Sequence, residues 1–223
     1  MAMVDFPKRI DAPRYMHESI SMVKPATGFC KLEARELQGC VNHNREFLRP
    51  WLQEKVDPAY FDAMKVVESV ANLSTCQYIL RVDGWVAGMI GVMREDKNTN
   101  TMEIAYWLDK RYSGRRIMSW AVGKIEKLCF LYGGAKKLEA RCGVYNEPAI
   151  RILERLGWTQ QDGKIRTSGV PYEVVVYSKV LSDWLNKPTG LANPYSRYGE
   201  ELLGQEKCMI EQMKMELVKG KAK

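Results

Sequence analysis

The stretch EIAYWLDKRYSGRRIMSWAV, residues 103–122, decides the fold because its hydrophobic pattern changes from that of a strand to that of a helix. We predict a strand over 102–108 and an amphipathic helix over 114–132, with apolar positions Ile117, Met118, Ala121, Val122, Ile125, Leu128 and Cys129. A glycine pair at 133–134 ends this helix, and residues 136–144 alternate as a second strand. Such a crossover places the two strands parallel in one sheet, with the helix packed on it.

The residues before this crossover predict strands that follow one another in antiparallel order. Apolar runs at 76–82 and 85–93 are split by Asp83-Gly84, a dipeptide typical of two-residue hairpin turns, and a turn at 95–100 leads into strand 102–108. Further predicted elements are a strand at 15–24, an irregular helix at 29–47, a helix with Asp57 as N-cap and Pro58 as first residue, a short helix capped by Asn146 and ended by Gly157, and strands at 158–161 and 172–180. This order predicts an α/β fold of the α+β type with a mixed sheet.

The chain divides into one large domain and two appendages. We assign residues 1–13 to an N-terminal extension, 14–186 to the domain, and 187–223 to a linker and a C-terminal amphipathic helix. The helix is predicted over 199–218, and its apolar stripe consists of Leu202, Met209, Ile210, Met213 and Leu217. A helix of this length is marginal in water, so the stripe packs either on its own domain or on a partner, as in a homodimer or larger assembly.

Composition excludes several classes of protein. The longest apolar runs fall short of the roughly 20 residues that a membrane span needs, and the N-terminus lacks the apolar region of a secretory signal. Six cysteines without a Cys-x-x-Cys pair, and only two histidines, argue against a zinc site or a disulfide framework and favour a cytoplasmic location. The net charge of +7 favours anionic ligands, but the cations gather at one helix start, which disfavours nucleic acid as a partner.

That helix start is the most informative local feature. Lys110, Arg111, Arg115 and Arg116 surround Gly114, between the end of a strand and a helix that we expect to begin at Ser113 or Gly114. The unpaired N–H groups and positive dipole end of a helix bind anions, so the segment is suited to a phosphate or pyrophosphate. The alternative is a solvated basic turn that only connects strand to helix.

Residues 103–122, followed by LEARCGVYNEPAIRILERLGW at 138–158, closely resemble the N-acetyltransferases of the GNAT superfamily, of the RimJ/RimL type. The resemblance covers roughly residues 14–184. It implies the GNAT-like acyl-CoA N-acyltransferase fold, with acetyl-CoA as co-substrate and no metal. The implied reaction is direct attack of a primary amine on the acetyl thioester in a ternary complex; the amine belongs to a protein N-terminus, a lysine or a small molecule.

The resemblance also assigns roles to individual residues. It implies that the cofactor binds to Trp107, Leu108, Arg111, Ser113, Gly114, Arg115, Arg116, Ile117, Met118 and Asn146. Glu103 is the implied general base, and the alternative is that it only pairs with Arg141 on the neighbouring strand. Asn146 equally fits a plain helix N-cap.

Two positions depart from the family pattern. Arg116 stands where the family has the second glycine of the pyrophosphate loop, and Ala149 stands where it has a serine that is one proposed proton donor to the departing thiolate. With that serine absent, Tyr145 or a water molecule remains as the acid. The departures also leave open a second hypothesis, a catalytically impaired GNAT-fold protein that serves as a binding or assembly component.

Overall fold

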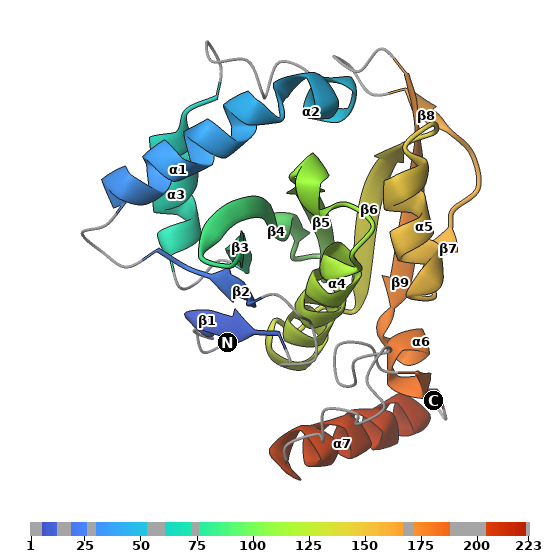
Figure 1. Cartoon of the computed structure of the whole chain (residues 1–223). Helices are drawn as coiled ribbons and strands as arrows, with labels where there is room; N and C mark the ends of the chain where they lie inside the picture. The colour runs from blue at the N-terminus through green and yellow to red at the C-terminus, as the bar shows by residue number, and fades with distance from the viewer. Residues whose placement is uncertain are drawn as a thin grey trace.

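The computed structural model describes residues 6–12, 19–25, 30–52, 61–72, 76–166, 172–187 and 204–221. These residues form one mixed sheet with helices on both faces (Figure 1). Its strands are β1 (Arg9–Asp11), β2 (Ile20–Val23), β3 (Gln77–Val82), β4 (Trp85–Asp96), β5 (Thr101–Leu108), β6 (Lys137–Gly143), β7 (Thr159–Gln160), β8 (Ile165–Arg166) and β9 (Glu173–Val180). They lie in the order β1-β2-β3-β4-β5-β6-β9-β7, and β8 also pairs with β9.

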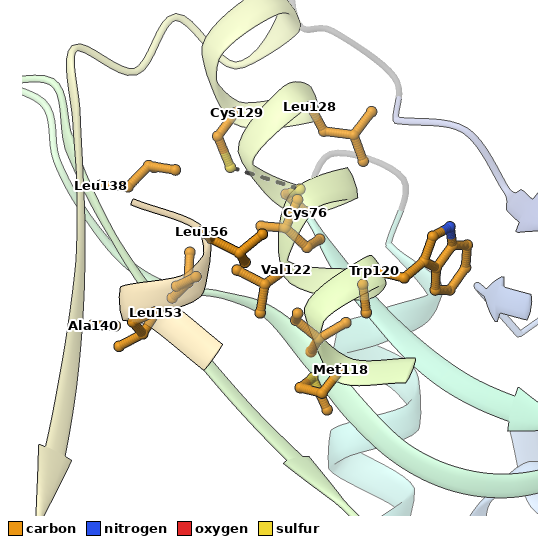
Figure 2. Packing of buried hydrophobic residues seen from close by; sticks show 14 of the residues in the cluster. Cys76, Met118, Trp120, Val122, Leu128, Cys129, Leu138, Ala140, Leu153 and Leu156 are labelled. Carbon is orange, nitrogen blue, oxygen red and sulfur yellow. Dashed lines mark hydrogen bonds between the residues drawn. The ribbon is translucent and has the colours of Figure 1, made fainter. Parts of the chain in front are cut away.

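The helices group by the face of the sheet that they cover. They are α1 (Cys30–His43), α2 (Arg45–Leu52), α3 (Ala63–Ala71), the 3-10 turn η2 (Lys110–Tyr112), α4 (Ile117–Lys127), the π-helical turn η3 (Leu128–Tyr132), α5 (Glu147–Arg155), α6 (Leu181–Asn186) and α7 (Gly204–Lys221). Helices α1 and α3 lie over β3 and β4 on one face, whereas α4 and α5 lie on the opposite face (Figure 1). Figure 2 shows the core between α4, α5 and the sheet, in which Met118, Val122 and Leu153 pack together.

Strands β5 and β6 pair only at their beginnings. They are parallel, as the crossover predicts, and their register runs from Thr101 opposite Lys137 to Glu103 opposite Glu139. Beyond this point β5 stays paired with β4 and β6 with β9, so the two strands diverge (Figure 1). A β-bulge in β4 between Val92 and Arg94 lies beside the point of divergence, and bulges bend and twist the strands that they interrupt.

Alternation along β5 sends its side chains to different faces. Ile104, Tyr106 and Leu108 pack against the main core on the α4 side. Trp107 packs against the clusters of α1, α2 and α3. Because successive residues of a strand point to opposite faces, Glu103 lies on the same side as Trp107.

A buried ion pair ties α4 to β9. The Glu126 side chain is 0% exposed and the Lys179 side chain 3% exposed, and Lys179 Nζ lies 2.9 Å from Glu126 Oε2. Trp158 Nε1 donates a hydrogen bond of 2.5 Å to Glu126 Oε1, and Lys179 Nζ donates one of 2.7 Å to the carbonyl of Leu156. Burial raises the pKa of Glu126 to about 7, although Lys179 opposes this shift.

The C-terminal helix packs on its own domain. Ile210 is 4% exposed within the main core. Glu206 forms an ion pair with Lys127 at 2.5 Å and accepts a hydrogen bond of 3.2 Å from the hydroxyl of Tyr132. The stripe residue Leu202 lies outside the described residues. The apolar stripe was expected to pack either on its own domain or on a partner. For Ile210 the structure shows the first alternative, because the domain covers this side chain. A homodimer or larger assembly stays a prediction.

Several sequence predictions need correction in detail. The irregular helix at 29–47 is two helices that break at Asn44, whose side chain donates to the carbonyl of Cys40. The third helix begins at Ala63 with Asp62 as N-cap, and the expected start at Asp57 and Pro58 lies outside the described residues. Of the strand predicted at 15–24, the structure describes Ile20–Val23. Strands β1 and β8 and helix α6 were not predicted. Over the described ranges no helix is long and apolar enough to cross a membrane.

Candidate active site

The anion-binding segment predicted around Gly114, from Lys110 to Arg116 and called the cradle below, lies between β5 and α4. Helix α4 begins at Ile117, not at Ser113 or Gly114 as the sequence predicted. The physical reason is the backbone conformation, because Gly114 has φ +77° and Arg116 has φ +64°, and neither value fits an α-helix. Arg116 thus occupies a left-handed position that glycine adopts freely and other residues adopt at a cost.

The cradle offers the donors that a phosphate group needs. The first N–H groups of a helix have no intrahelical acceptor, and in α4 these belong to Ile117 and the residues that follow it. The side chains of Ile117 and Met118 are buried, which fixes the helix start against the core. By contrast, Ser113, Arg115 and Arg116 are exposed, so their side chains can reach an anion at this end of the helix. These residues therefore fit a pyrophosphate group.

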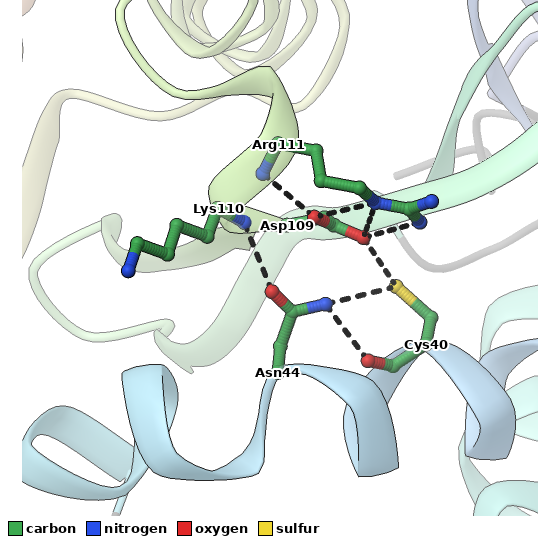
Figure 3. A network of polar contacts seen from close by, with 5 residues as sticks. All are labelled: Cys40, Asn44, Asp109, Lys110 and Arg111. Carbon is green, nitrogen blue, oxygen red and sulfur yellow. Dashed lines mark hydrogen bonds and ion pairs between the residues drawn. The ribbon is translucent and has the colours of Figure 1, made fainter.

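A buried carboxylate that the sequence analysis did not single out shapes this loop. Asp109 is 0% exposed, and its carboxylate accepts hydrogen bonds from Arg111 N at 2.8 Å and Arg111 Nη2 at 2.7 Å (Figure 3). Burial by itself would raise the pKa of Asp109, but the hydrogen bonds from Arg111 and Asn44 hold it below its ordinary value. Arg111, predicted to bind the cofactor, is thus also the counter-ion of Asp109.

The same loop is attached to the break between α1 and α2. Asn44 is 2% exposed; its Oδ1 accepts from Lys110 N at 2.9 Å, and its Nδ2 donates to the carbonyl of Cys40 at 2.9 Å (Figure 3). The Cys40 thiol lies 3.8 Å from Asp109 Oδ2, and burial raises the pKa of this thiol to about 12, so it stays a neutral donor. The helices on one face therefore position the cradle, which leads into α4 on the other face.

The predicted catalytic residue Glu103 lies at the other end of β5. Its side chain is 20% exposed, and its Oε2 lies 3.3 Å from Arg141 Nε and 3.9 Å from Arg94 Nη1. The ion pair that the sequence analysis weighed as the alternative is therefore present. Both contacts are made by Oε2, so neither of these two ion pairs uses the other carboxylate oxygen of Glu103. The role of Glu103 as a base stays a prediction.

The first turn of α5 lies across the divergence from β5. Asn146 is the N-cap of α5, and its side chain accepts from Ala149 N at 3.4 Å, which confirms the capping interpretation. The Tyr106 hydroxyl donates to the carbonyl of Ala149 at 3.2 Å. Tyr145, predicted as a proton donor, has a side chain that is 78% exposed. Its role stays a prediction, as do the cofactor contacts of Trp107, Leu108 and Asn146.

An aromatic contact joins α2 to the start of β9. The rings of Trp51 and Tyr172 lie 6.2 Å apart in an edge-to-face arrangement, and the Tyr172 hydroxyl donates to the carbonyl of Trp51 at 3.0 Å. A Cβ atom on Gly143 would lie 2.6 Å from the Tyr172 ring, so a larger residue at the end of β6 would displace this ring. This contact connects α2 with the β6–β9 side of the sheet.

The residues that sequence reasoning missed are Asp109, Asn44 and the hydroxyl of Tyr106. One local signal was available, because an Asp just before a turn of Lys and Arg residues is a common N-cap. The partners of Asn44 and Tyr106 lie 66 and 43 residues away in the sequence, and no local pattern indicates them.

Comparisons with known proteins agree with this geometry. A model of the acetyltransferase (GNAT) domain matches residues 31–159, which is more than half of the chain. The chain belongs to the GNAT acetyltransferase family. A curated relative, the Bacillus subtilis protein named "Putative ribosomal N-acetyltransferase YdaF", is 25% identical over 178 residues, which cover 75% of this chain and 93% of the relative.

Solved structures of this fold include enzymes crystallised with their cofactor. The microcin C7 self-immunity acetyltransferase MccE, in complex with acetyl-CoA and AMP, has a TM-score of 0.60 and 23% identity over 72% of this chain and 92% of MccE. The ribosomal-protein-S5-alanine acetyltransferase of Vibrio fischeri has a TM-score of 0.64 and 18% identity over 78% of this chain and 98% of that chain. These likenesses establish the GNAT fold for the present chain.

Proposed function

We propose that the protein transfers the acetyl group of acetyl-CoA to the α-amine of a protein N-terminus. The observation that carries the proposal is the direct succession of the diverging strand β5, the cradle and the start of α4. The names of the relatives support the substrate class, because YdaF and the Vibrio fischeri enzyme are both named for ribosomal or ribosomal-protein acetylation.

In the proposed complex the pyrophosphate of acetyl-CoA binds to the N–H groups at the start of α4, assisted by Arg115 and Arg116. The pantetheine arm follows the edge of β5 that has separated from β6, where backbone groups of residues 104–108 face the gap. Its two amides can form the hydrogen bonds that a neighbouring strand would otherwise make. The thioester then lies along β5, between the cradle and Glu103.

The chemistry of the amine favours an N-terminal α-amine over a lysine. An α-amine has a pKa of about 8 and a lysine of about 10.4, so roughly one α-amine in ten is neutral at pH 7 against fewer than about one lysine in a thousand. Glu103 is paired with Arg141 and Arg94, and we propose that it accepts the surplus proton through water. An amine that is already partly neutral demands less from such a base.

The test combines titration calorimetry with acetyl transfer. Acetyl-CoA is titrated into the protein, and transfer is then measured with peptides that have a free N-terminus and no lysine. Matched controls have a blocked N-terminus and one lysine. We expect binding, and transfer to the free N-terminus at least tenfold faster than to the lysine. Faster lysine transfer would overturn the substrate class. Binding without transfer to any amine would favour the assembly component, and absence of binding would refute the proposal.

A further inference from the structure

The side chain of Tyr106 connects the two sides of the divergence. Tyr106 belongs to β5 and packs on the α4 face, and its hydroxyl reaches the carbonyl of Ala149 in the first turn of α5, at 3.2 Å. Helix α5 follows β6 in the chain, so the phenol extends from the strand on one side of the gap to the helix that follows the strand on the other. This hydroxyl thus lies beside the gap that we assign to the pantetheine arm.

The Tyr106 hydroxyl can turn its hydrogen away from the Ala149 carbonyl toward a ligand at a small cost in free energy. A carbonyl in the first turn of a helix already accepts the N–H group four residues later, so Ala149 does not depend on Tyr106 for its hydrogen bond. The side chain of Ala149 carries no hydroxyl that could compete. Burial raises the pKa of Tyr106 well above its ordinary value, with Cys142 nearby adding to the shift, so the phenol remains protonated and available as a donor.

Glu103 and Tyr106 lie three residues apart on opposite faces of one strand. A reaction centre at the gap therefore has a carboxylate on the side of α1 and a phenol on the side of α4. Acyl transfer to an amine needs a proton acceptor at the attacking nitrogen and a proton donor at the leaving sulfur. The two faces of β5 supply one group for each.

We propose that the hydroxyl of Tyr106 donates a hydrogen bond to the coenzyme A sulfur as the acetyl group leaves, and so stabilises the departing thiolate. The assignment rests on the proposed function, because it requires acetyl-CoA in the gap. It goes beyond that function by naming the donor to the departing sulfur that the sequence, with Ala149 at the serine position, did not supply.

The step balances without any further reactant. The nitrogen lone pair forms the C–N bond and the carbonyl electrons move to oxygen; they then return as the C–S bond breaks, and sulfur keeps that electron pair. Tyr106 keeps its proton and stabilises the thiolate through the hydrogen bond. The proton lost by the nitrogen passes through Glu103 to water, and the thiolate takes up a proton from water to give the free thiol of coenzyme A. The products are one amide and one thiol.

The first test measures sulfur recognition without an acceptor amine. Coenzyme A and desulfo-coenzyme A, which lacks the thiol, are titrated into the wild type and the Tyr106→Phe variant from pH 7 to pH 9.5. A thiol titrates at about 8.5 in a model compound, and a hydrogen bond to its anion favours the charged form. The sulfur preference is the affinity for coenzyme A divided by the affinity for desulfo-coenzyme A. Between pH 7 and pH 9.5 we expect this ratio to rise about tenfold more in the wild type than in Tyr106→Phe. Desulfo-coenzyme A should bind both proteins equally.

Tyr177→Phe is the matched control. This buried tyrosine lies on β9, and its hydroxyl contacts Glu154 and Gln160, each at 3.1 Å. Loss of this hydroxyl should leave the sulfur preference at the wild-type value. Equal pH profiles in the wild type and Tyr106→Phe would overturn the assignment. If neither ligand binds the wild type, the proposed function itself is wrong, so the two failures are distinguishable.

The second test follows turnover with the free N-terminal peptides. Tyr106→Phe should lower kcat at least tenfold, with little change in the KM for acetyl-CoA, because the donor acts on the leaving group. Ala149→Ser, added to Tyr106→Phe, places a hydroxyl on the same turn of α5 and should restore part of kcat. If Tyr145→Phe lowers kcat and Tyr106→Phe does not, the exposed tyrosine is the acid and the proposal is wrong.

Discussion

The buried carboxyl of Glu126 gives the protein an unusual dependence of stability on pH. The folded-state pKa of Glu126 is about 7, against an ordinary value of 4.5. Between these values the native state binds more protons than the unfolded state, so the free energy of unfolding falls as the pH rises. The contribution of protonated Glu126 to the free energy of unfolding is fully present below pH 4.5 and is lost as the pH rises through 7.

The size of the effect follows from the two pKa values. A shift from 4.5 to about 7 corresponds to roughly 3 kcal/mol over the whole titration. Between pH 5 and pH 8, linkage with these values gives a loss of about 2–3 kcal/mol. Because the carboxyl is 0% exposed, solvent screening does not reduce this figure.

The assay compares the wild type with the double variant Glu126→Gln/Lys179→Met, in which neither position titrates. Urea unfolding of both proteins is followed by tryptophan fluorescence at pH 5, 6, 7 and 8 and constant ionic strength. Titration of all other groups cancels in the difference between the proteins. We expect the stability of the wild type relative to the double variant to fall by about 2–3 kcal/mol from pH 5 to pH 8. A difference that is flat, or that grows with pH, would refute the reasoning.

The single variant Lys179→Met provides a second measurement on the same pair. It leaves Glu126 buried with Trp158 as a remaining donor. Breaking a buried pair in this way costs about 3–5 kcal/mol, and we expect this loss at pH 8 relative to the wild type. The double variant should recover most of it, because no uncompensated charge remains.

Four further predictions concern the cradle, the base and the C-terminal helix. Asp109→Asn removes the charge that holds Arg111, so acetyl-CoA should bind about tenfold more weakly in calorimetry; an unchanged Kd would show that the loop does not depend on this carboxylate. Glu103→Gln should lower kcat about 10²-fold or more with nearly unchanged acetyl-CoA affinity, and a wild-type rate at neutral pH would assign Glu103 to structure. Arg116→Gly relieves a positive φ and should be up to about 1 kcal/mol more stable than Arg116→Ala in urea unfolding; equal stabilities would contradict the strain. Ile210→Ala opens the contact of α7 with the main core and should cost about 2–4 kcal/mol, whereas a loss below about 0.5 kcal/mol would show that α7 does not contribute to the fold.

The sequence by itself determined the features that depend on neighbouring residues. The Asp83-Gly84 hairpin is present, with φ +49° and +85° at these residues, because a two-residue turn of this kind is selected by its own backbone sterics. The change of hydrophobic period after Leu108 predicted strand β5, helix α4 and the parallel pairing of β5 with β6. Asn146 predicted the start of α5. The start of α4 was placed too early, because the φ angle of Arg116 is not apparent from its residue type.

Only the tertiary structure decided which distant groups meet. Asp109 holds Arg111 within one loop, but Asn44 reaches that loop from the break between α1 and α2, and Glu126 meets Lys179 across 53 residues. Tyr106 meets Ala149 because β5 and β6 diverge beyond Glu103, and that divergence depends on strand register. Hydrophobic period, turns and caps arise from contacts within a few residues, and so they can be read along the chain. The pairing of side chains across the sheet depends on how the elements pack, which is settled only when the whole domain folds.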